Sequence, residues 1–204
     1  FPVDGKFTPE QNDVYQEVLK AQKLGIENVN TKNSMKNIHD LTVRSISESL
    51  VNLGLVPMGV EETTSMMHYF EFFMHGTGHW LGLDVHDAGS TELNGKPRKL
   101  LPGMVTTIEP GIYVRPNKET IDFPLLERDA TKIRERRKEL GMEEATKLEK
   151  EEIEKAKTIK HEIPKNLLGI GVRIEDDIVC TNQEPINLTE GVPRSVEEIE
   201  ELCK

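Results

Sequence analysis

Apolar residues recur at helical spacing in two segments near the start of the chain, and each segment has recognisable ends. In the first, Thr8 and Gln11 form a capping box around Pro9, and the apolar stripe stops at Gly25. The same spacing predicts a second helix over residues 34–53. We expect both helices to cover one face of a sheet.

Beyond residue 68 the pattern changes to short runs rich in β-branched or aromatic residues, which favour strands. These runs predict strands at residues 69–74, 105–108, 112–114, 169–175 and 178–181. The last two are expected to form a pair around Asp176 and Asp177. A second capping box, Ser195 with Glu198, opens a C-terminal helix. Helices, then strands, then a last helix, with no repeating βαβ unit, indicate the α+β class.

A segment dense in charge separates two of the predicted strands. Between Glu127 and Glu162 there are eleven acidic and eleven basic residues, so the segment is close to neutral. Its apolar residues recur at helical spacing, with Gly141 as a break, and predict a protruding helical hairpin or one long helix, inserted between two strands. We interpret residues 117–166 as a charged helical insertion, and we favour a solvated structural element over a partner-binding arm.

Composition narrows the function classes. The formal net charge of -10 falls on the rest of the chain, and an acidic surface argues against nucleic acid and anionic membranes as partners. No apolar run approaches the ~20 residues that span a bilayer. The two cysteines, Cys180 and Cys203, give no disulfide framework and are typical of a cytoplasmic protein with reduced thiols. The chain opens on Phe1 and not on Met, from which we expect a fragment or a processed product.

Three histidines lie within twelve residues, next to the end of a predicted strand. His75 and His79 have the i, i+4 spacing of the helical zinc motif His-Glu-x-x-His, but Gly76 replaces the glutamate and Gly78 disfavours a helix. We expect these glycines to let the backbone approach a ligand closely. With His86 the cluster predicts a functional site, whereas each histidine taken alone would be read as an ordinary core or surface residue.

Two carboxylates lie on predicted strands farther along the chain. Glu109 follows the apolar run at residues 105–108, where a carboxylate is costly unless it is paired or binds a metal. Alternation places Arg173 and Glu175 on one face of a strand, where a surface ion pair between them is the alternative to a functional role. One imidazole and two carboxylates suit divalent manganese, cobalt or zinc. Three protein ligands are too few for a two-metal site.

In this order, the three islands resemble the aminopeptidase P (Xaa-Pro aminopeptidase) branch of the pita-bread metallopeptidases. The islands are residues 73–87 (FMHGTGHWLGLDVHD), 109–113 (EPGIY) and 171–177 (GVRIEDD), and residues 1–11 resemble the segment before the family's first long helix. The resemblance covers most of the chain outside the insertion. It implies the C-terminal portion of a pita-bread (creatinase/aminopeptidase) fold, with residues 1–204 as part of one catalytic domain.

The resemblance also implies which residues hold the metals. His79 and Glu109 would bind one metal ion, and Glu175 would bridge two divalent ions, usually manganese. His75 and His86 would lie beside the metals and stabilise the substrate and the tetrahedral intermediate.

Further roles follow from the same resemblance. Arg173 would orient the bridging carboxylate, and Tyr113 would contribute to the shape of the site. The metals would lower the pKa of a bridging water that attacks the peptide bond before proline, while Glu109 helps to move its proton. The substrate would be a peptide with a free N-terminus and proline in the second position. We expect the full-length protein to be a homo-oligomer.

Two features depart from the family's pattern. The family's first two metal ligands are aspartates upstream of the segment that matches Phe1, and no equivalent pair exists here, because Asp84 and Asp87 belong to the histidine island. The upstream substrate-site histidine and the N-terminal domain are absent as well. From this we expect the chain alone to hold metals weakly and to hydrolyse little. The insertion is the second departure and bears on the oligomer interface and the substrate entrance.

Two other interpretations stay open. The missing aspartates and the charged insertion suit a non-catalytic pita-bread module that binds a peptide or protein without cleaving it. A related enzyme acting on creatine-like or initiator-methionine substrates is disfavoured by the resemblance of residues 80–84 (WLGLD).

Overall fold

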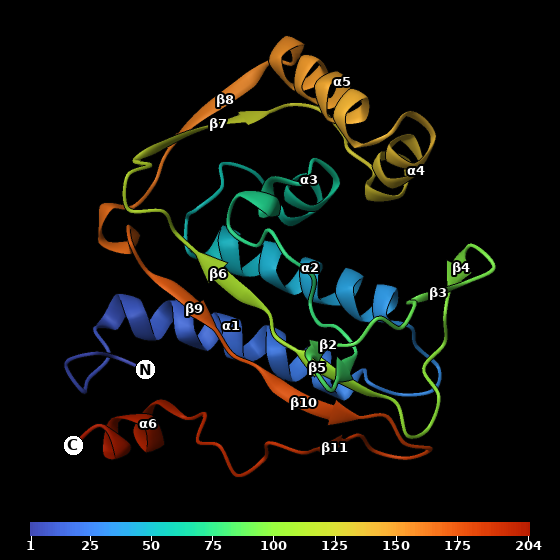
Figure 1. Cartoon of the computed structure of the whole chain (residues 1–204). Coiled ribbons are helices and arrows are strands. Elements are labelled where there is room, and N and C mark those ends of the chain that lie inside the picture. The colour runs from blue at the N-terminus through green and yellow to red at the C-terminus, as the bar shows by residue number, and fades with distance from the viewer.

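Two long helices pack against the strands and carry much of the core (Figure 1). α1 (Pro9–Glu27) and α2 (Met35–Asn52) each begin at a reciprocal capping box, at Thr8 and at Ser34. The computed structural model, which describes residues 1–204, therefore has both helices where the capping signals and the apolar spacing predict them. None of the helices combines the length and the apolarity that a membrane crossing requires.

The main strands form an antiparallel ladder with a break in its middle. They are β5 (Val105–Ile108), β6 (Gly111–Tyr113), β9 (Gly171–Arg173), β10 (Asp176–Val179) and β11 (Ile186–Asn187). β10 pairs with both β5 and β11, and β9 pairs with β6. The register of β5 with β10 continues unchanged into the pairing of β6 with β9. Glu109 and Glu175 therefore lie opposite each other at the break.

Two predictions about these strands are wrong. Residues 169–175 do not pair with residues 178–181, because Asp176 and Asp177 lie inside β10 and make no turn. Residues 69–74 form no strand; they begin with a 3-10 helix, η1 (His68–Glu71), that follows α3 (Val60–Ser65). The aromatic content of this run suggested a strand, but its buried residues, Tyr69, Phe72 and Phe73, have a helical spacing and not an alternating one.

Apolar side chains from helices and strands meet in two clusters. The larger one lies between α1, α2 and the β6–β9 pair, and Val14, Ile46 and Ile112 are fully buried in it. The smaller one places Ile108 and Ile178 beneath the strand ends that carry the carboxylates. Each such side chain contributes about 1.5–3 kcal/mol by its burial, so the clusters fix the positions of β5 and β10.

Short elements that the sequence pattern did not predict surround this framework. β1 (Leu81–Gly82) pairs with β2 (Val85–His86), and β3 (Glu92–Leu93) pairs with β4 (Lys96–Pro97). In the second hairpin Asn94 and Gly95 both have positive φ, the geometry that favours an Asn-Gly turn. The remaining elements are η2 (Lys165–Leu167) and α6 (Val196–Leu202), which begins at the predicted Ser195 capping box.

The charged segment folds as a ribbon that carries two helices. β7 (Thr120–Pro124) and β8 (Thr158–Glu162) pair antiparallel, and α4 (Ala130–Leu140) and α5 (Met142–Lys155) follow at the far end of the ribbon (Figure 1). Gly141 has φ 81 and separates the helices, so the segment does not form one long helix. The helices lie over α3 and one end of α2, and not away from the body of the protein (Figure 1).

Candidate metal centre

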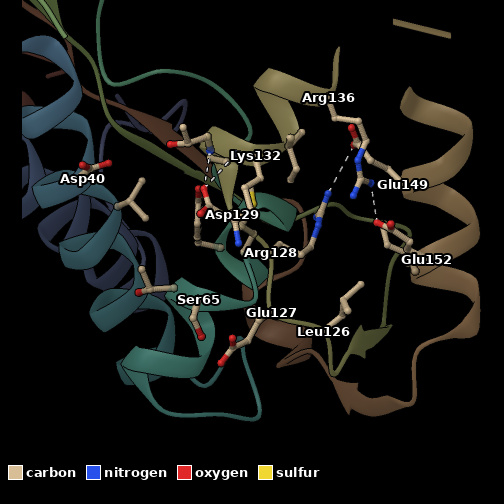
Figure 2. Close-up of a pocket in the computed structure, with 18 of the residues that line it drawn as sticks. Asp40, Ser65, Leu126, Glu127, Arg128, Asp129, Lys132, Arg136, Glu149 and Glu152 are labelled. Atoms are coloured by element: carbon tan, nitrogen blue, oxygen red, sulfur yellow. Dashed lines mark hydrogen bonds and ion pairs between the residues drawn. The ribbon is translucent and has the colours of Figure 1, made fainter. Parts of the chain in front are cut away.

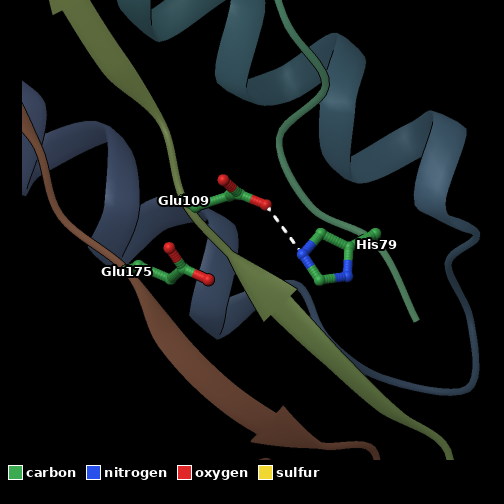
Figure 3. Close-up of side chains that lie close together, drawn as sticks. All are labelled: His79, Glu109 and Glu175. Atoms are coloured by element: carbon green, nitrogen blue, oxygen red, sulfur yellow. Dashed lines mark ion pairs between the residues drawn. The ribbon is translucent and has the colours of Figure 1, made fainter. Parts of the chain in front are cut away.

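Three side chains from separate parts of the sequence converge at the break in the ladder (Figure 3). His79, Glu109 and Glu175 each offer one ligand atom, and these atoms all lie within 4.8 Å of one another. The strand register sets the two carboxylates opposite each other. The histidine comes from the loop beside the free edge of β5, where Trp80 bridges to Thr106 and the Thr107 amide donates to the His79 carbonyl.

The imidazole of His79 turns one ring nitrogen toward a carboxylate. Its Nδ1 donates to the Trp80 carbonyl at 3.0 Å. Its Nε2 therefore faces the cluster, 3.2 Å from Glu109 Oε1. A ligating histidine that donates its other N–H to a carbonyl is the usual arrangement at metal sites, so the donor set fits a divalent metal.

Glu109 is held on both of its oxygens. The Thr107 hydroxyl donates to Oε1 at 3.1 Å, and Arg173 Nη1 donates to Oε2 at 3.2 Å. The residue is only 8% exposed, and a buried carboxylate without such partners would cost several kcal/mol. Arg173 therefore neutralises one oxygen while the other faces His79.

Glu175 is more exposed than Glu109, yet it is still partly shielded from solvent. Burial raises the pKa of the Glu175 carboxyl, and the negative charge of Glu109 raises it further. Arg173 and His79 act in the opposite direction. Two carboxylates opposite each other in a sheet destabilise it, and a bound cation would remove that repulsion.

His75 belongs to a chain of hydrogen bonds behind the three ligands. Its Nδ1 donates to the Gly76 carbonyl at 2.7 Å, which leaves Nε2 to accept from the Tyr113 hydroxyl at 2.9 Å. Tyr113 in turn accepts from Arg173 Nε at 2.7 Å. Burial lowers the pKa of His75, in agreement with the neutral ring that this order of donors requires. The chain fixes the imidazole and the guanidinium relative to each other.

His86 lies beside His79. His86 is exposed in β2, and its ring stands edge-on to the His79 ring with 4.3 Å between ring centroids.

The six residues predicted for the site therefore lie in one region. They are His75, His79, His86, Glu109, Arg173 and Glu175. Asp84 and Asp87 are exposed and do not join the cluster.

Sequence reasoning missed the residues that support the ligands. Thr107 bonds Glu109 and also accepts from the His79 amide at 3.0 Å. Its position two residues before Glu109 on a strand places both on one face, and that alternation could have found it. The expected role of the glycines is wrong for Gly78, where a Cβ would lie 1.9 Å from the Thr107 carbonyl oxygen. Gly78 therefore lets the loop that carries His79 approach strand β5. It does not serve to bring the backbone close to a ligand.

Comparison with known proteins assigns the class. The model of metallopeptidase family M24 matches residues 1–182, so the chain belongs to metallopeptidase family M24. Within that family it is 37% identical to the Xaa-Pro aminopeptidase of Haemophilus influenzae over 202 residues, which are 99% of this chain and 37% of the relative.

Solved structures give the same result. The chain matches the Pseudomonas aeruginosa aminopeptidase PepP with a TM-score of 0.75 and 36% identity, over 100% of this chain and 36% of that one. An Escherichia coli aminopeptidase P variant in complex with substrate matches with a TM-score of 0.74 and 33% identity, over the same shares. The resemblance to aminopeptidase P and the pita-bread fold are thereby confirmed. The chain spans little more than a third of the length of these relatives.

Proposed function

We propose that this chain supplies part of the active site of a metal-dependent aminopeptidase that removes the first residue of a peptide when proline is second. The observation that carries the proposal is the convergence of one ligand atom each from His79, Glu109 and Glu175, all within 4.8 Å of one another. Its relatives are named Xaa-Pro aminopeptidases, and one was solved in complex with substrate.

In this proposal His79, Glu109 and Glu175 hold divalent metal ions. Manganese is our first choice, and cobalt and zinc suit the same nitrogen and oxygen ligands. When bound, such ions lower the pKa of a water molecule and polarise a peptide carbonyl. A pair of ions needs more ligands than three, so the proposal requires further carboxylates beyond those that residues 1–204 place at the cluster.

The chain's own residues then divide the remaining tasks. Glu109 Oε1, held by the Thr107 hydroxyl, faces the centre of the cluster, where it accepts the proton of the attacking water and returns it to the departing proline nitrogen. Arg173 keeps the other oxygen of Glu109 neutralised. His86, beside His79, would donate to the substrate carbonyl and to the tetrahedral intermediate. His75, whose proton bonds the Gly76 carbonyl, would contribute by holding Tyr113 and Arg173 in place.

A second candidate is a non-catalytic module of the same fold that binds peptides. The specific observation in its favour is that the cluster offers three ligand atoms, fewer than a working two-metal site uses. It predicts peptide binding that does not depend on metal and is not followed by cleavage.

The test uses the natural gene product that contains this chain, loaded with manganese. Cleavage of a peptide that begins Xaa-Pro, and not of the matched Xaa-Ala peptide, is the expected result. His79→Ala and Glu175→Ala should each abolish cleavage while the circular dichroism spectrum stays unchanged. Cleavage retained in either variant with full metal content would sink the proposal. Binding without any cleavage in the unaltered protein would favour the second candidate.

A further inference from the structure

A cavity opens beside the loop that leads to His79. It has a volume of about 380 Å³, and its lining includes His75, Gly76, Thr77 and Gly78, the four residues that precede this ligand in the chain. Much of the rest is apolar and soft, with Met35, Met67 and Met74 among the lining side chains. Methionine side chains adapt to partners of different shape, so this wall suits a variable apolar ligand.

The cavity continues beneath the charged insertion. A second cavity of about 770 Å³ lies between α2 and α3 on one side and α4 and α5 on the other (Figure 2). The two cavities share five lining residues, namely Lys36, His39, Met67, Tyr69 and Ala130. The two cavities therefore adjoin, one beside His75 and the other under the insertion, and we refer to them together as the groove.

The insertion also closes the groove on the side of the β3–β4 hairpin. Arg134 of α4 lies 2.7 Å from Glu92 of the hairpin, and Lys138 lies 3.5 Å from the same carboxylate. Arg134 and Glu92 both line the smaller cavity. The roof over this part of the groove thus consists of two exposed ion pairs. Such pairs contribute little to stability, so the roof can open at low cost.

The rest of the insertion is held firmly. Arg137 binds the buried Glu149 through two hydrogen bonds of 3.1 and 2.8 Å, which ties α4 to α5. The Arg128 amide donates to the Ser65 carbonyl at 2.8 Å, and His68 Nε2 donates to the Pro124 carbonyl at 2.8 Å. The groove therefore has a fixed wall on its outer side.

We propose that this groove binds the residues that follow proline in a peptide substrate, and that the insertion makes the enzyme prefer longer peptides over tripeptides. The inference rests on the proposed function, because an aminopeptidase of this kind has one residue on the N-terminal side of the bond that breaks. A groove that begins at His75, on the loop that leads to His79, can then take only the C-terminal side. Its apolar wall would hold side chains after proline, and Lys36 and Arg134 would meet backbone carbonyls or the terminal carboxylate.

The experiment compares a tripeptide Xaa-Pro-Yaa with a heptapeptide that begins with the same three residues, in the manganese-loaded natural gene product. The first variant is Ala130→Trp, which places a large side chain where the two cavities join. We expect kcat/KM for the heptapeptide to fall about tenfold or more, mainly through KM, and kcat/KM for the tripeptide to stay within about twofold. Glu139→Trp is the matched control, because Glu139 is exposed on the same helix and lines neither cavity.

A second variant removes the insertion helices. The Leu125 amide donates to the Lys157 carbonyl at 2.7 Å, so an Asn-Gly turn can join these two residues in place of residues 126–156. Loss of the heptapeptide preference with normal tripeptide cleavage is expected again. Equal losses for both peptides in Ala130→Trp, or an unchanged preference in both variants, would overturn the inference. If the unaltered protein cleaves neither peptide, the proposed function fails. Heptapeptide affinity measured by calorimetry then decides the groove, which stands only if Ala130→Trp weakens it.

Discussion

Glu109 and Glu175 lie directly opposite each other where the antiparallel ladder of β5–β6 with β9–β10 is interrupted. Cross-strand neighbours of like charge destabilise a sheet, and the strand register on both sides fixes the backbones of these two residues opposite each other. Arg173 offsets the negative charge at one oxygen of Glu109, while the pKa of the Glu175 carboxyl stays raised. The fold therefore maintains an electrostatic cost at a point where a divalent cation would remove it.

This cost predicts opposite effects of one substitution on stability and on metal binding. Glu175→Gln should raise the free energy of unfolding of the metal-free protein by up to about 1 kcal/mol, because it removes the repulsion. It should also weaken manganese binding by more than about tenfold, since even indirect supports of a metal site cost that much. Urea unfolding in chelator and calorimetric titration with manganese measure the two effects. A variant that is less stable without metal and binds metal normally would contradict this account.

Gly78 should tolerate no side chain, in contrast to Gly76. A Cβ at position 78 would lie 1.9 Å from the Thr107 carbonyl oxygen, whereas at position 76 it would meet its nearest atom at 3.7 Å. We expect Gly78→Ala to cost about 3 kcal/mol or more and to displace His79 from Glu109. Gly76→Ala is the control and should change the unfolding free energy by less than about 1 kcal/mol. Thermal unfolding and manganese titration of both variants check this, and equal stability of the two would contradict the close approach.

A buried ion pair fixes the C-terminal segment to β10. Asp176 is 1% exposed and accepts from Arg194 through two contacts of 2.6 Å and from Gln22 Nε2 at 2.5 Å. Arg194→Met leaves a buried charge without its main partner, so we expect a loss of about 3–5 kcal/mol in urea unfolding. Lys20→Met breaks an exposed pair with Glu48 of similar length and should change stability by less than about 1 kcal/mol. Similar effects of the two substitutions would mean that burial is not decisive here.

Local signals explain why much of the fold could be predicted. The predicted capping boxes at Thr8 and Ser195 act within one helical turn, and each helix begins where its box lies. The box at Ser34 was missed, and the apolar spacing alone predicted that helix. Two further local signals went unused. The Asn94-Gly95 turn could have predicted the β3–β4 hairpin, and the alternation of buried Ile121 and Phe123 could have predicted strand β7 of the β7–β8 pair.

Other features depend on contacts that no short stretch contains. The strand predicted at residues 69–74 was wrong. The packing of Tyr69 and Phe73 in the core decides the local structure there, and the strand propensity of these aromatic residues does not. For the site, the residue types indicated a metal, and the resemblance selected His79, Glu109 and Glu175. The opposition of the two glutamates follows from strand register, and the role of Gly78 follows from a contact across 29 residues of sequence with Thr107. Neither can be derived from spacing alone.

The buried His68, which contacts the insertion at Pro124, should make the free energy of unfolding depend on pH. The residue is 2% exposed, its Nε2 donates to the Pro124 carbonyl, and its Nδ1 is buried without a hydrogen-bond partner. Burial lowers the pKa of His68, the hydrogen bond to Pro124 opposes this in part, and the nearby Arg128 lowers the pKa further. A second proton would have to enter at Nδ1, where nothing accepts it. The folded protein therefore holds this ring neutral at a pH where the unfolded chain already binds a proton.

The sign of the effect follows from the lowered pKa. The pKa of a histidine in the unfolded chain is about 6.5, and above this pH the contribution of neutral His68 to the free energy of unfolding is complete. As the pH falls from there through the folded pKa, this contribution is lost, by up to about 1.4 kcal/mol per pH unit. Burial also lowers the pKa values of His39 and His75, so acid destabilisation of the unaltered protein has several sources. His68→Gln keeps a donor for Pro124 but cannot titrate, and it should reduce the slope of unfolding free energy between about pH 5 and pH 6.5. Urea unfolding in chelator across this range measures both slopes. Parallel curves would show that His68 does not keep its neutral state on folding.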